Sequence, residues 1–315
     1  MHLPKLFVNA ELGHGTAGAA RDFCSAWPNQ TSITVHAKNY VPEDAPHEIG
    51  AALAGCMKKL RGYSFFHACA EPTPDRQSRI FLQDVKMNKS ALIVGAGSGL
   101  SAALARALSQ KGYRCILAAR NVDKLAALAQ ETGAQCMRCD VAADGEVAAL
   151  FARMDAEGFL PGVVIYNPSA RSRGPLVELE PAEVAHAIQV TAFGGFLVAQ
   201  QAVRRMLRAG GGTIVFSGAS ASVKGYAQSA PFAMGKFALR GLAQSMAREL
   251  APQGIHVAHV VFDGGIRSEA CPVPAESPDS LLDPAAIAAT YLHLIEQPRR
   301  TWTWEMKVRP WLERF

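Results

Sequence analysis

From residue 90 onward, short runs rich in β-branched residues alternate with alanine-rich runs of helical length. The first strand candidate is Ala91–Val94, and a predicted helix over Leu100–Lys111 follows it. Further strands are predicted near Cys115–Ala119, Gln135–Cys139, Val163–Tyr166, Ile214–Ser217, His256–Phe262 and Thr303–Val308. Strands and helices that alternate at this spacing favour a parallel sheet covered on both faces. The sequence therefore predicts an α/β chain with a Rossmann-type, doubly wound parallel sheet of seven strands.

The part of the chain before residue 90 lacks this regular alternation. Residues 1–62 hold two short strand candidates and two helix candidates, and a piece of this size buries too little apolar surface to be stable alone. Residues 63–89 mix aromatic residues, prolines and charges without a sustained period, which is typical of a linker. We therefore predict a small N-terminal βαβα appendage over 1–62, a linker over 63–89 and a main domain over 90–315.

The amino-acid composition limits the kinds of partner that the protein is expected to bind. Apolar residues make up 49% of the chain and charged residues 19%, so a large core is expected and a disordered chain is excluded. The net charge is +5 without a run of basic residues, which argues against nucleic acid or a membrane as partner. The seven cysteines fit a reducing compartment, and we predict a cytoplasmic protein with neither a membrane span nor a signal peptide. Cys136 and Cys139 lack a second ligand pair for zinc, so no metal site is expected.

A glycine-rich turn directly follows the first predicted strand. From residue 94 to residue 101 it reads Val, Gly, Ala, Gly, Ser, Gly, Leu, Ser. Glycines in such a turn let backbone N–H groups approach a pyrophosphate, which then lies at the N-terminus of the next helix. We predict a dinucleotide at this turn, contacted by Gly95, Ser98, Gly99 and Leu100.

Three later segments, each after a predicted strand, extend the pattern. They are Cys139-Asp140-Val141, Tyr166-Asn167-Pro168-Ser169 and Asp263-Gly264-Gly265-Ile266. With the glycine turn, they make the chain over roughly residues 90–310 resemble the short-chain dehydrogenase/reductase family, although Val94 and Ser101 depart from its Thr-Gly-x-x-x-Gly-x-Gly motif. The resemblance implies a nicotinamide dinucleotide cofactor. It places Asp140 and Val141 at the adenine, carries over Asn167, and places Gly264 and Ile266 near the nicotinamide amide.

The end of the second predicted strand bears on the choice of cofactor. Family members that prefer NAD have a carboxylate there, which binds the ribose hydroxyls. In this chain Ala119 takes that position and Arg120 follows, so no negative charge repels a 2′-phosphate and a guanidinium is present to pair with it. A solvated arginine just beyond a strand is the ordinary alternative. We predict that NADP(H) is preferred over NAD(H), with Arg120 at the phosphate.

The reaction site that the resemblance implies is incomplete in this chain. The family uses a Tyr-x-x-x-Lys pair, in which the tyrosine passes a proton to the carbonyl and the lysine holds the ribose. Phe232 and Lys236 stand at these two places, so the lysine is kept and the tyrosine hydroxyl is lost. The family's orienting serine falls on Ala219 and its asparagine on Thr191.

Two interpretations of this loss stay open. In the first, the chain is an oxidoreductase that reduces a carbonyl or an activated C=C bond of an unknown small molecule through another proton donor, with Lys236 and Tyr226 as catalytic candidates. Further hydroxyl candidates are Tyr166, Ser217, Ser220 and Ser222. In the second, the protein binds NADP(H) without turnover, as a sensor or an assembly partner. In either case the resemblance implies a homodimer or homotetramer, formed through the two long helices around residues 184–206 and 232–250.

Residues 1–62 carry a second resemblance. Residues 4–11, 21–24, 27–30 and 43–50 are similar to the C-terminal tail of the haloalkane dehalogenases, which have the α/β-hydrolase fold. Where that family has its catalytic histidine this chain has Asn39, and the family's nucleophilic aspartate belongs to a part of the fold that is lacking here. We therefore expect no dehalogenase activity and take His36 and His47 as surface residues. Our hypothesis is that residues 1–86 are a fused remnant or a mis-set start, and that Met87 opens the functional domain.

Overall fold

A computed structural model describes residues 5–10, 30–35, 49, 51–52, 88–269 and 271–313. The chain divides into two units, Met1–Asp84 and Val85–Phe315. In the first unit, β1 (Lys5–Ala10) pairs in parallel with β2 (Gln30–Val35). These strands fall where two strands of the appendage are predicted. Most of the appendage, including Asn39, His36 and His47, and linker residues 63–87 lie outside the described residues, so the domain boundaries stay predictions.

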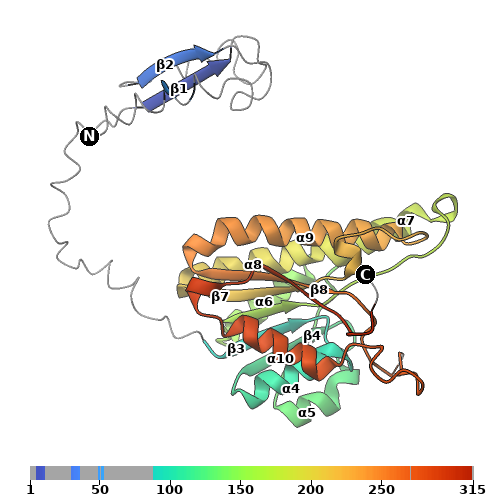
Figure 1. Ribbon diagram of the computed structural model, residues 1–315. Coiled ribbons are helices and arrows are strands. Elements are labelled where there is room, and N and C mark those ends of the chain that lie inside the picture. The colour runs from blue at the N-terminus through green and yellow to red at the C-terminus, as the bar shows by residue number, and fades with distance from the viewer. Residues whose placement is uncertain are drawn as a thin grey trace. The chain divides into compact units, whose positions relative to one another are not determined.

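Seven strands of the second unit form one parallel sheet (Figure 1). They are β3 (Ser90–Val94), β4 (Arg114–Ala119), β5 (Gln135–Arg138), β6 (Val163–Tyr166), β7 (Gly212–Ser217), β8 (Ile255–Phe262) and β9 (Glu305–Val308). Their order across the sheet is β5-β4-β3-β6-β7-β8-β9, so the direction of winding reverses between β3 and β6. The predicted Rossmann-type, doubly wound sheet is confirmed.

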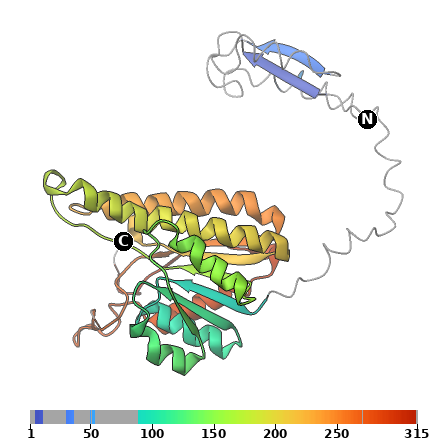
Figure 2. The same cartoon turned by 180° about the vertical axis from the view of Figure 1, so that it is seen from behind.

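Helices cover both faces of this sheet, with α4, α5 and α10 on one face and α6, α8 and α9 on the other (Figures 1 and 2). The helices are α4 (Leu100–Gln110), α5 (Ala126–Thr132), α6 (Glu146–Ala156), α7 (Pro181–Ile188), α8 (Gly194–Ala209), α9 (Ala230–Leu250) and α10 (Pro284–Ile295). Shorter helical turns are η2 (Asp123–Leu125), η3 (Leu176–Glu178), η4 (Gln189–Phe193, a π-helical turn), η5 (Ser220–Ser222), η6 (Ala251–Gln253) and η7 (Arg299–Thr301).

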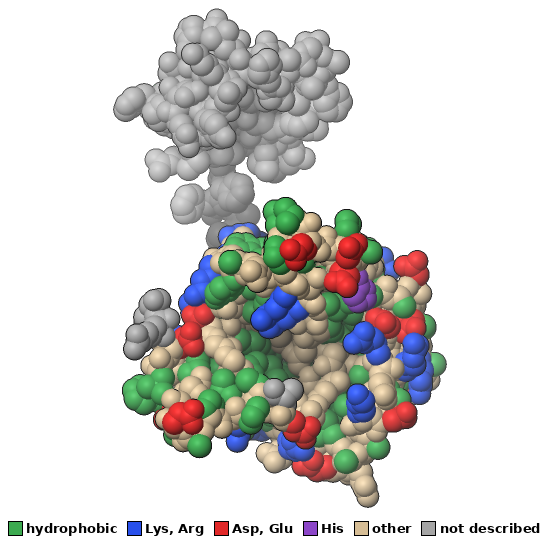
Figure 3. All heavy atoms as spheres, turned by 90° about the vertical axis from the view of Figure 1, so that its right-hand side faces the viewer, with side chains coloured by type: hydrophobic (Ala, Val, Ile, Leu, Met, Phe, Trp, Pro, Cys, Tyr) green, Lys and Arg blue, Asp and Glu red, His purple; other side chains and the backbone are tan. Residues whose placement is uncertain are grey.

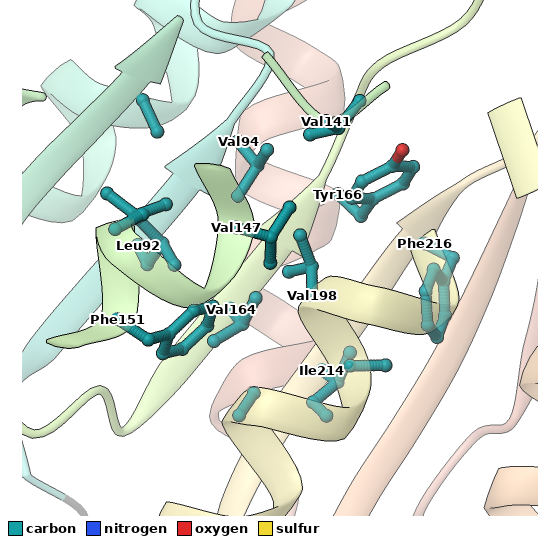
Figure 4. Close-up of a cluster of buried hydrophobic side chains, with 14 of the residues drawn as sticks. Leu92, Val94, Val141, Val147, Phe151, Val164, Tyr166, Val198, Ile214 and Phe216 are labelled. Carbon is teal, nitrogen blue, oxygen red and sulfur yellow. The ribbon is translucent and has the colours of Figure 1, made fainter. Parts of the chain in front are cut away.

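Alternate residues of each strand point to opposite faces of the sheet and so build two cores. On one face, Leu92 of β3, Val164 of β6 and Ile214 of β7 stand in register. They pack with Phe151 of α6 and Val198 of α8 in one buried cluster (Figure 4). Because both faces are covered, the central strands are apolar at nearly every position, which is why the sequence pattern was clear.

Two adjacent glycines let α8 approach the sheet where β6 ends. A Cβ at Gly194 would lie 2.6 Å from the Tyr166 hydroxyl oxygen, and one at Gly195 would lie 2.8 Å from Cδ1 of Leu239. The fully buried Tyr166 donates its hydroxyl proton to the Val190 carbonyl oxygen in the π-helical turn. This bond fixes the end of β6, from which part of the candidate site extends.

One continuous helical stretch among the described residues, Pro181–Ala209, is long and apolar enough by length and composition to cross a membrane. The sequence analysis predicted a long helix around residues 184–206, as a contact between subunits, and no membrane span. Val198, Ala199 and Ala202 of this stretch lie in the buried cluster against the sheet, so one face of this helix packs in the protein core, whereas Phe193 and Phe196 are exposed.

A row of polar side chains joins α9 to the edge strand β9. The Glu305 carboxylate accepts two hydrogen bonds from the Arg240 guanidinium, at 2.6 and 2.8 Å, and its Oε2 lies 3.0 Å from His259 Nδ1. His259 Nε2 lies 3.3 Å from the Ser222 hydroxyl oxygen. Both Ser222 and His259 are fully buried, so no substrate reaches this serine and the row is structural. Burial lowers the pKa of His259 to about 4.

The low pKa of His259 predicts a loss of stability in mild acid. Between pH 6.5 and pH 4 the unfolded chain binds a proton at this histidine and the folded chain does not, so the free energy of unfolding falls as the pH falls. We expect this residue to contribute roughly 1 kcal/mol of that decrease per pH unit between pH 6 and pH 5. Urea unfolding at several pH values measures the slope. The variant His259→Gln should show a shallower slope, and an identical slope would contradict the assignment.

Candidate functional site

The predicted site residues gather beyond the carboxyl ends of the parallel strands. The face toward which these ends point is hollowed at its centre, and backbone and uncharged polar atoms form most of the floor (Figure 3). Two adjoining cavities lie here, a large cavity of about 560 Å³ and a small cavity of about 320 Å³. Both are lined by Gly95, Asn167 and Ser169, so together they form one trough across the point where the winding reverses.

The glycine turn forms the edge shared by the two cavities. Gly95 has a φ of +77°, and a Cβ there would lie 2.8 Å from the backbone nitrogen of Pro168, so only glycine fits. Ser101, which departs from the family's motif, fastens the turn. Its hydroxyl donates to the Gly95 carbonyl oxygen at 3.0 Å and accepts a hydrogen bond from Asn167 Nδ2 at 2.8 Å. The serine thus ties the turn to the loop after β6.

The small cavity collects the residues predicted for the adenosine end of a dinucleotide. Arg120, Asp140 and Val141 line it together. The Asp140 carboxylate accepts a hydrogen bond from the Ala142 backbone N–H at 3.0 Å, which shapes the turn after β5. Arg120 is exposed and makes no hydrogen bond or ion pair with any described residue. Its guanidinium is therefore available to an anionic ligand.

The large cavity collects most of the remaining predicted residues. Those that line it are Gly95, Gly99, Leu100, Asn167, Lys236, Gly264 and Ile266. Ser98 is the exception, because its exposed side chain lies on the outer side of the turn, in a neighbouring groove lined also by Arg106. The structure thus does not bring the Ser98 side chain to either cavity.

Lys236 is the buried cation of the large cavity. It lies on α9, is 3% exposed, and donates a hydrogen bond from Nζ to the Ser217 carbonyl oxygen at 2.7 Å. Burial, and then the positive charge of Arg171, lower the pKa of Lys236 to about 7. At neutral pH this side chain therefore exists in both its protonated and its neutral form.

A second polar network supports the floor of the same cavity. The Ser217 hydroxyl is hydrogen-bonded to Asn167 Oδ1 and lies 2.8 Å from the hydroxyl oxygen of the fully buried Tyr291. Burial raises the pKa of the Tyr291 phenol, so this group stays protonated. The network holds Asn167 in place from the side opposite to Ser101.

The positions that correspond to the family's catalytic residues lie close together in the structure. Ala219, Phe232 and Lys236 all line the large cavity, and the Lys236 ammonium lies 5.9 Å from the centre of the Phe232 ring. Thr191 lies behind them, fully buried, and its hydroxyl accepts a hydrogen bond from the Ala170 backbone N–H at 3.1 Å. Neither Ala219 nor Phe232 presents a hydroxyl to the cavity.

The proposed substitute hydroxyls fall into different surroundings. Tyr166 and Ser222 are fully buried and cannot meet a substrate, whereas Ser217 and Ser220 line the large cavity. Tyr226 is 45% exposed and lines a separate outer cavity of about 480 Å³. The Lys224 ammonium lies 5.3 Å from the centre of the Tyr226 ring, and the interaction with Tyr226 raises the pKa of Lys224. The structure thus does not bring Tyr226 into the large cavity beside Lys236.

Ser169 and Arg171 are among the residues of the trough that the sequence analysis did not predict. Ser169 lines both cavities, and Arg171 lines the large and the outer cavity. Both follow Tyr166, the last residue of β6, by a few positions. The rule that ligands bind beyond the carboxyl ends of parallel strands was sufficient to indicate them. Among the described residues, no group of three or more His, Cys, Asp or Glu side chains is placed to hold a metal ion.

Comparison with known proteins gives a consistent result for most of the chain. A family model described as short chain dehydrogenase matches residues 89–270. The 3-oxoacyl-(acyl-carrier-protein) reductase of Rattus norvegicus is 30% identical over 186 residues, which are 58% of this chain and 78% of that protein. Among solved structures, a short-chain dehydrogenase from Rhodopseudomonas palustris is 33% identical with a TM-score of 0.62, over 70% of this chain and 98% of that one. A metagenomic short-chain oxidoreductase in complex with NADP is 27% identical with a TM-score of 0.63, over 72% and 99% of the two chains.

A different similarity covers a short segment. A haloalkane dehalogenase from Sphingobium indicum is 58% identical over 59 residues, which are 19% of this chain. The chain spans only about a fifth of the length of that relative, since the match covers 20% of it. The expected resemblance to this second family is therefore confirmed for a fragment.

Proposed function

The chain belongs to the short-chain dehydrogenase family, whose members are oxidoreductases, and on this premise we propose that it is an NADPH-dependent reductase with an atypical proton donor. Its reaction is the reduction of a carbonyl or an activated C=C bond in a small molecule. One observation carries the proposal. The buried Lys236 lines the cavity beside the glycine turn, at the place where the family's tyrosine is replaced by Phe232.

The trough has the features that a bound NADP(H) molecule requires. The glycine turn leaves no Cβ between the backbone and the space above it, and Arg120 offers an unpaired guanidinium at the small cavity. A solved relative with 27% identity is a complex with NADP. The proposed contacts are Arg120 with the 2′-phosphate, Asp140 and Val141 with the adenine, Gly95, Gly99 and Leu100 with the pyrophosphate, Asn167 and Lys236 with the ribose, and Gly264 and Ile266 with the nicotinamide amide.

The role of Arg120 makes a selective prediction. The variant Arg120→Ala should weaken NADPH binding by about 10- to 100-fold, because an ion-paired hydrogen bond to the 2′-phosphate is lost. Binding of NADH, which lacks this phosphate, should change little. Isothermal titration calorimetry with both nucleotides measures this. The control is Arg153→Ala, which removes an exposed arginine paired with Glu157 on α6, away from both cavities. Equal losses for NADPH and NADH in Arg120→Ala would contradict the role.

The chain's own residues account for the proton that reduction requires. When bound, the reduced nicotinamide supplies a hydride. The Lys236 ammonium lines the large cavity and, with its pKa near 7, gives up a proton easily at neutral pH. We assign this proton to the carbonyl oxygen, or to the carbon next to the activating group when a C=C bond is reduced. Solvent then returns the proton to Lys236.

The experiment that tests the function is a substrate screen. The full-length protein with NADPH is mixed with aldehydes, ketones, quinones and enoyl thioesters, and NADPH oxidation is followed by absorbance. The proposal predicts turnover with at least one class, and turnover that survives in Phe232→Ala. In the same assay, a loss of rate in Tyr226→Phe would support the catalytic role predicted for Tyr226. An unchanged rate would show that Tyr226 is not catalytic.

A silent NADP(H)-binding protein is the second candidate function, as a sensor or an assembly partner. It is favoured by the side chains at three family positions, since Phe232, Ala219 and Thr191 replace the proton-donating and orienting groups. Tight NADPH binding without turnover of any substrate class would support it. If Phe232→Tyr combined with Ala219→Ser restores carbonyl reduction, the protein is a silenced member of the family.

We also propose that the protein forms a homodimer or homotetramer in the cytoplasm. Aromatic residues on and beside the two long helices are exposed, among them Phe193, Phe196 and Phe237. The rings of Phe193 and Phe196 stack with their centres 5.9 Å apart. A second subunit packed on these helices would remove this apolar surface from water. Neither nucleic acid nor a membrane is a proposed partner, and dehalogenase activity is not proposed.

A further inference from the structure

The large cavity opens into the outer cavity past one aromatic ring. The two cavities share five lining residues, which are Arg171, Ser220, Phe232, Gly264 and Gly265. Phe232 therefore stands at the passage between the space proposed for the nicotinamide and a second space of about 480 Å³. A molecule that lies across both spaces would contact the residues that the two cavities share.

The charges around this passage are unbalanced. Arg171 and Lys236 line the large cavity, and none of the described residues lining it is acidic. Arg171 is exposed and makes no hydrogen bond or ion pair with any described residue, and loss of solvation, followed by the charge of the neighbouring Arg173, lowers its pKa. The outer cavity does hold Asp263 and Glu313, but the Asp263 carboxylate is paired with Lys307 at 2.9 Å.

Phe232 holds the Arg171 guanidinium in a defined position. The Cζ atom of Arg171 lies 4.1 Å from the centre of the Phe232 ring, which is the geometry of a cation–π contact. A guanidinium placed over a ring keeps the N–H groups along its edge free. Those groups form a planar fork that matches the two oxygens of a carboxylate, or two oxygens of a phosphate. The ring that replaces the family's tyrosine thus serves as a platform for an unpaired cation.

We propose that Arg171 is the anion-binding residue of the substrate site, and that the substrate is an organic oxyanion whose reducible group points past Phe232 toward the cofactor. This inference rests on the proposed function and adds the substrate class to it. A carboxylate or phosphate group supplies the negative charge that the described lining of the large cavity lacks. Neutral ketones and aldehydes leave Arg171 without a partner and are poor substrates.

Binding of paired probes tests the proposal on the full-length protein. Benzoate and benzamide have nearly the same shape, but only benzoate carries a charge, and phenyl phosphate distinguishes phosphate from carboxylate. Calorimetry with the NADP⁺-loaded protein should show benzoate or phenyl phosphate binding at least about tenfold tighter than benzamide, which corresponds to one charge-assisted contact. Arg171→Met should abolish this difference, and Arg171→Lys should keep only part of it, because lysine has the charge without the fork.

Two controls separate this inference from the function on which it rests. Arg248→Met removes a positive charge at the far end of α9, where the Arg248 guanidinium donates to the Gln244 carbonyl oxygen and, among the described residues, to no other group, and should leave the preference for benzoate intact. NADP⁺ affinity should stay within about twofold in Arg171→Met. A tenfold loss of NADP⁺ affinity would assign Arg171 to the cofactor and overturn the proposal, as would equal binding of benzoate and benzamide. If NADP⁺ does not bind the wild-type protein, the proposed function fails. The comparison of benzoate with benzamide is then repeated without NADP⁺, and tighter binding of benzoate still supports the anion-binding role of Arg171, whereas equal binding contradicts it.

Discussion

Replacing Lys236 with Met is expected to slow NADPH-dependent reduction by about 100-fold or more and at the same time to raise the Tm of the protein. The rate falls because the variant loses the proton donor that we propose for the large cavity. The Tm rises because Met fills a similar volume without a charge, and Lys236 is 3% exposed with no carboxylate of the described residues paired with it. Each kcal/mol gained corresponds to a rise of about 2–4 °C for a domain of this size.

The pH dependence of both quantities identifies the lysine as the cause. With a folded pKa of about 7, the protonated donor disappears above pH 7, so the reduction rate of the wild-type protein should fall as the pH rises through that value. Between pH 7 and the ordinary lysine value of 10.5, the unfolded chain holds more protons than the folded one. Wild-type stability therefore rises with pH across this window, and the Tm advantage of Lys236→Met should shrink between pH 7 and pH 9.

Stopped-flow kinetics and thermal unfolding of the cofactor-free protein at several pH values measure these effects. Normal turnover in Lys236→Met would show that Lys236 is not the proton donor. A Tm advantage that is constant with pH would show that the lysine is not buried in its charged form.

Replacing Gly95 with Val is expected to weaken NADPH binding by about 100-fold or more. The φ of +77° is strained for any β-branched residue, and the new Cβ would lie 2.8 Å from the Pro168 nitrogen. The glycine turn and the loop after β6 would have to separate, which opens the edge shared by the two cavities. Calorimetry with NADPH measures the loss.

A second glycine provides the matched control for backbone strain. Gly112 has a φ of +78°, lines neither cavity, and has only the Lys89 ammonium within 4 Å of its Cβ position, at 4.0 Å. Gly112→Val should lower the Tm by a similar mechanism but leave NADPH affinity unchanged. If both variants bind NADPH like the wild type, the glycine turn does not form the cofactor site.

The sheet and the glycine turn were predictable because their signals are local. The apolar runs at β3, β6 and β7 are continuous, since both faces of these strands are covered. The turn over 94–101 follows the first of them directly, so its position at the carboxyl edge follows from the order of the elements alone. The long helix around residues 184–206 was also predicted, and the structure extends this helical stretch to 181–209 with one face packed in the core.

The substrate side of the site depended on loops that meet only in the folded chain. Tyr226 lies in a loop near Gln228, a non-glycine residue with a φ of +57°, and this loop directs it to the outer cavity. The contact between Arg171 and Phe232 joins residues separated by sixty-one positions, one after β6 and one on α9. No periodicity or motif in the sequence predicts such a contact. The sequence shows that Phe232 replaces the family's tyrosine, but the structure was needed to show which residues the Phe232 ring contacts.

Calorimetric titration of the full-length, cofactor-free protein with NADPH and with NADH tests the central claim most directly. We expect NADPH to bind with one site per chain and at least about tenfold more tightly than NADH, because only NADPH carries the phosphate that we propose to pair with Arg120. Absence of binding heat for both nucleotides on folded protein, or tighter binding of NADH, would contradict the account.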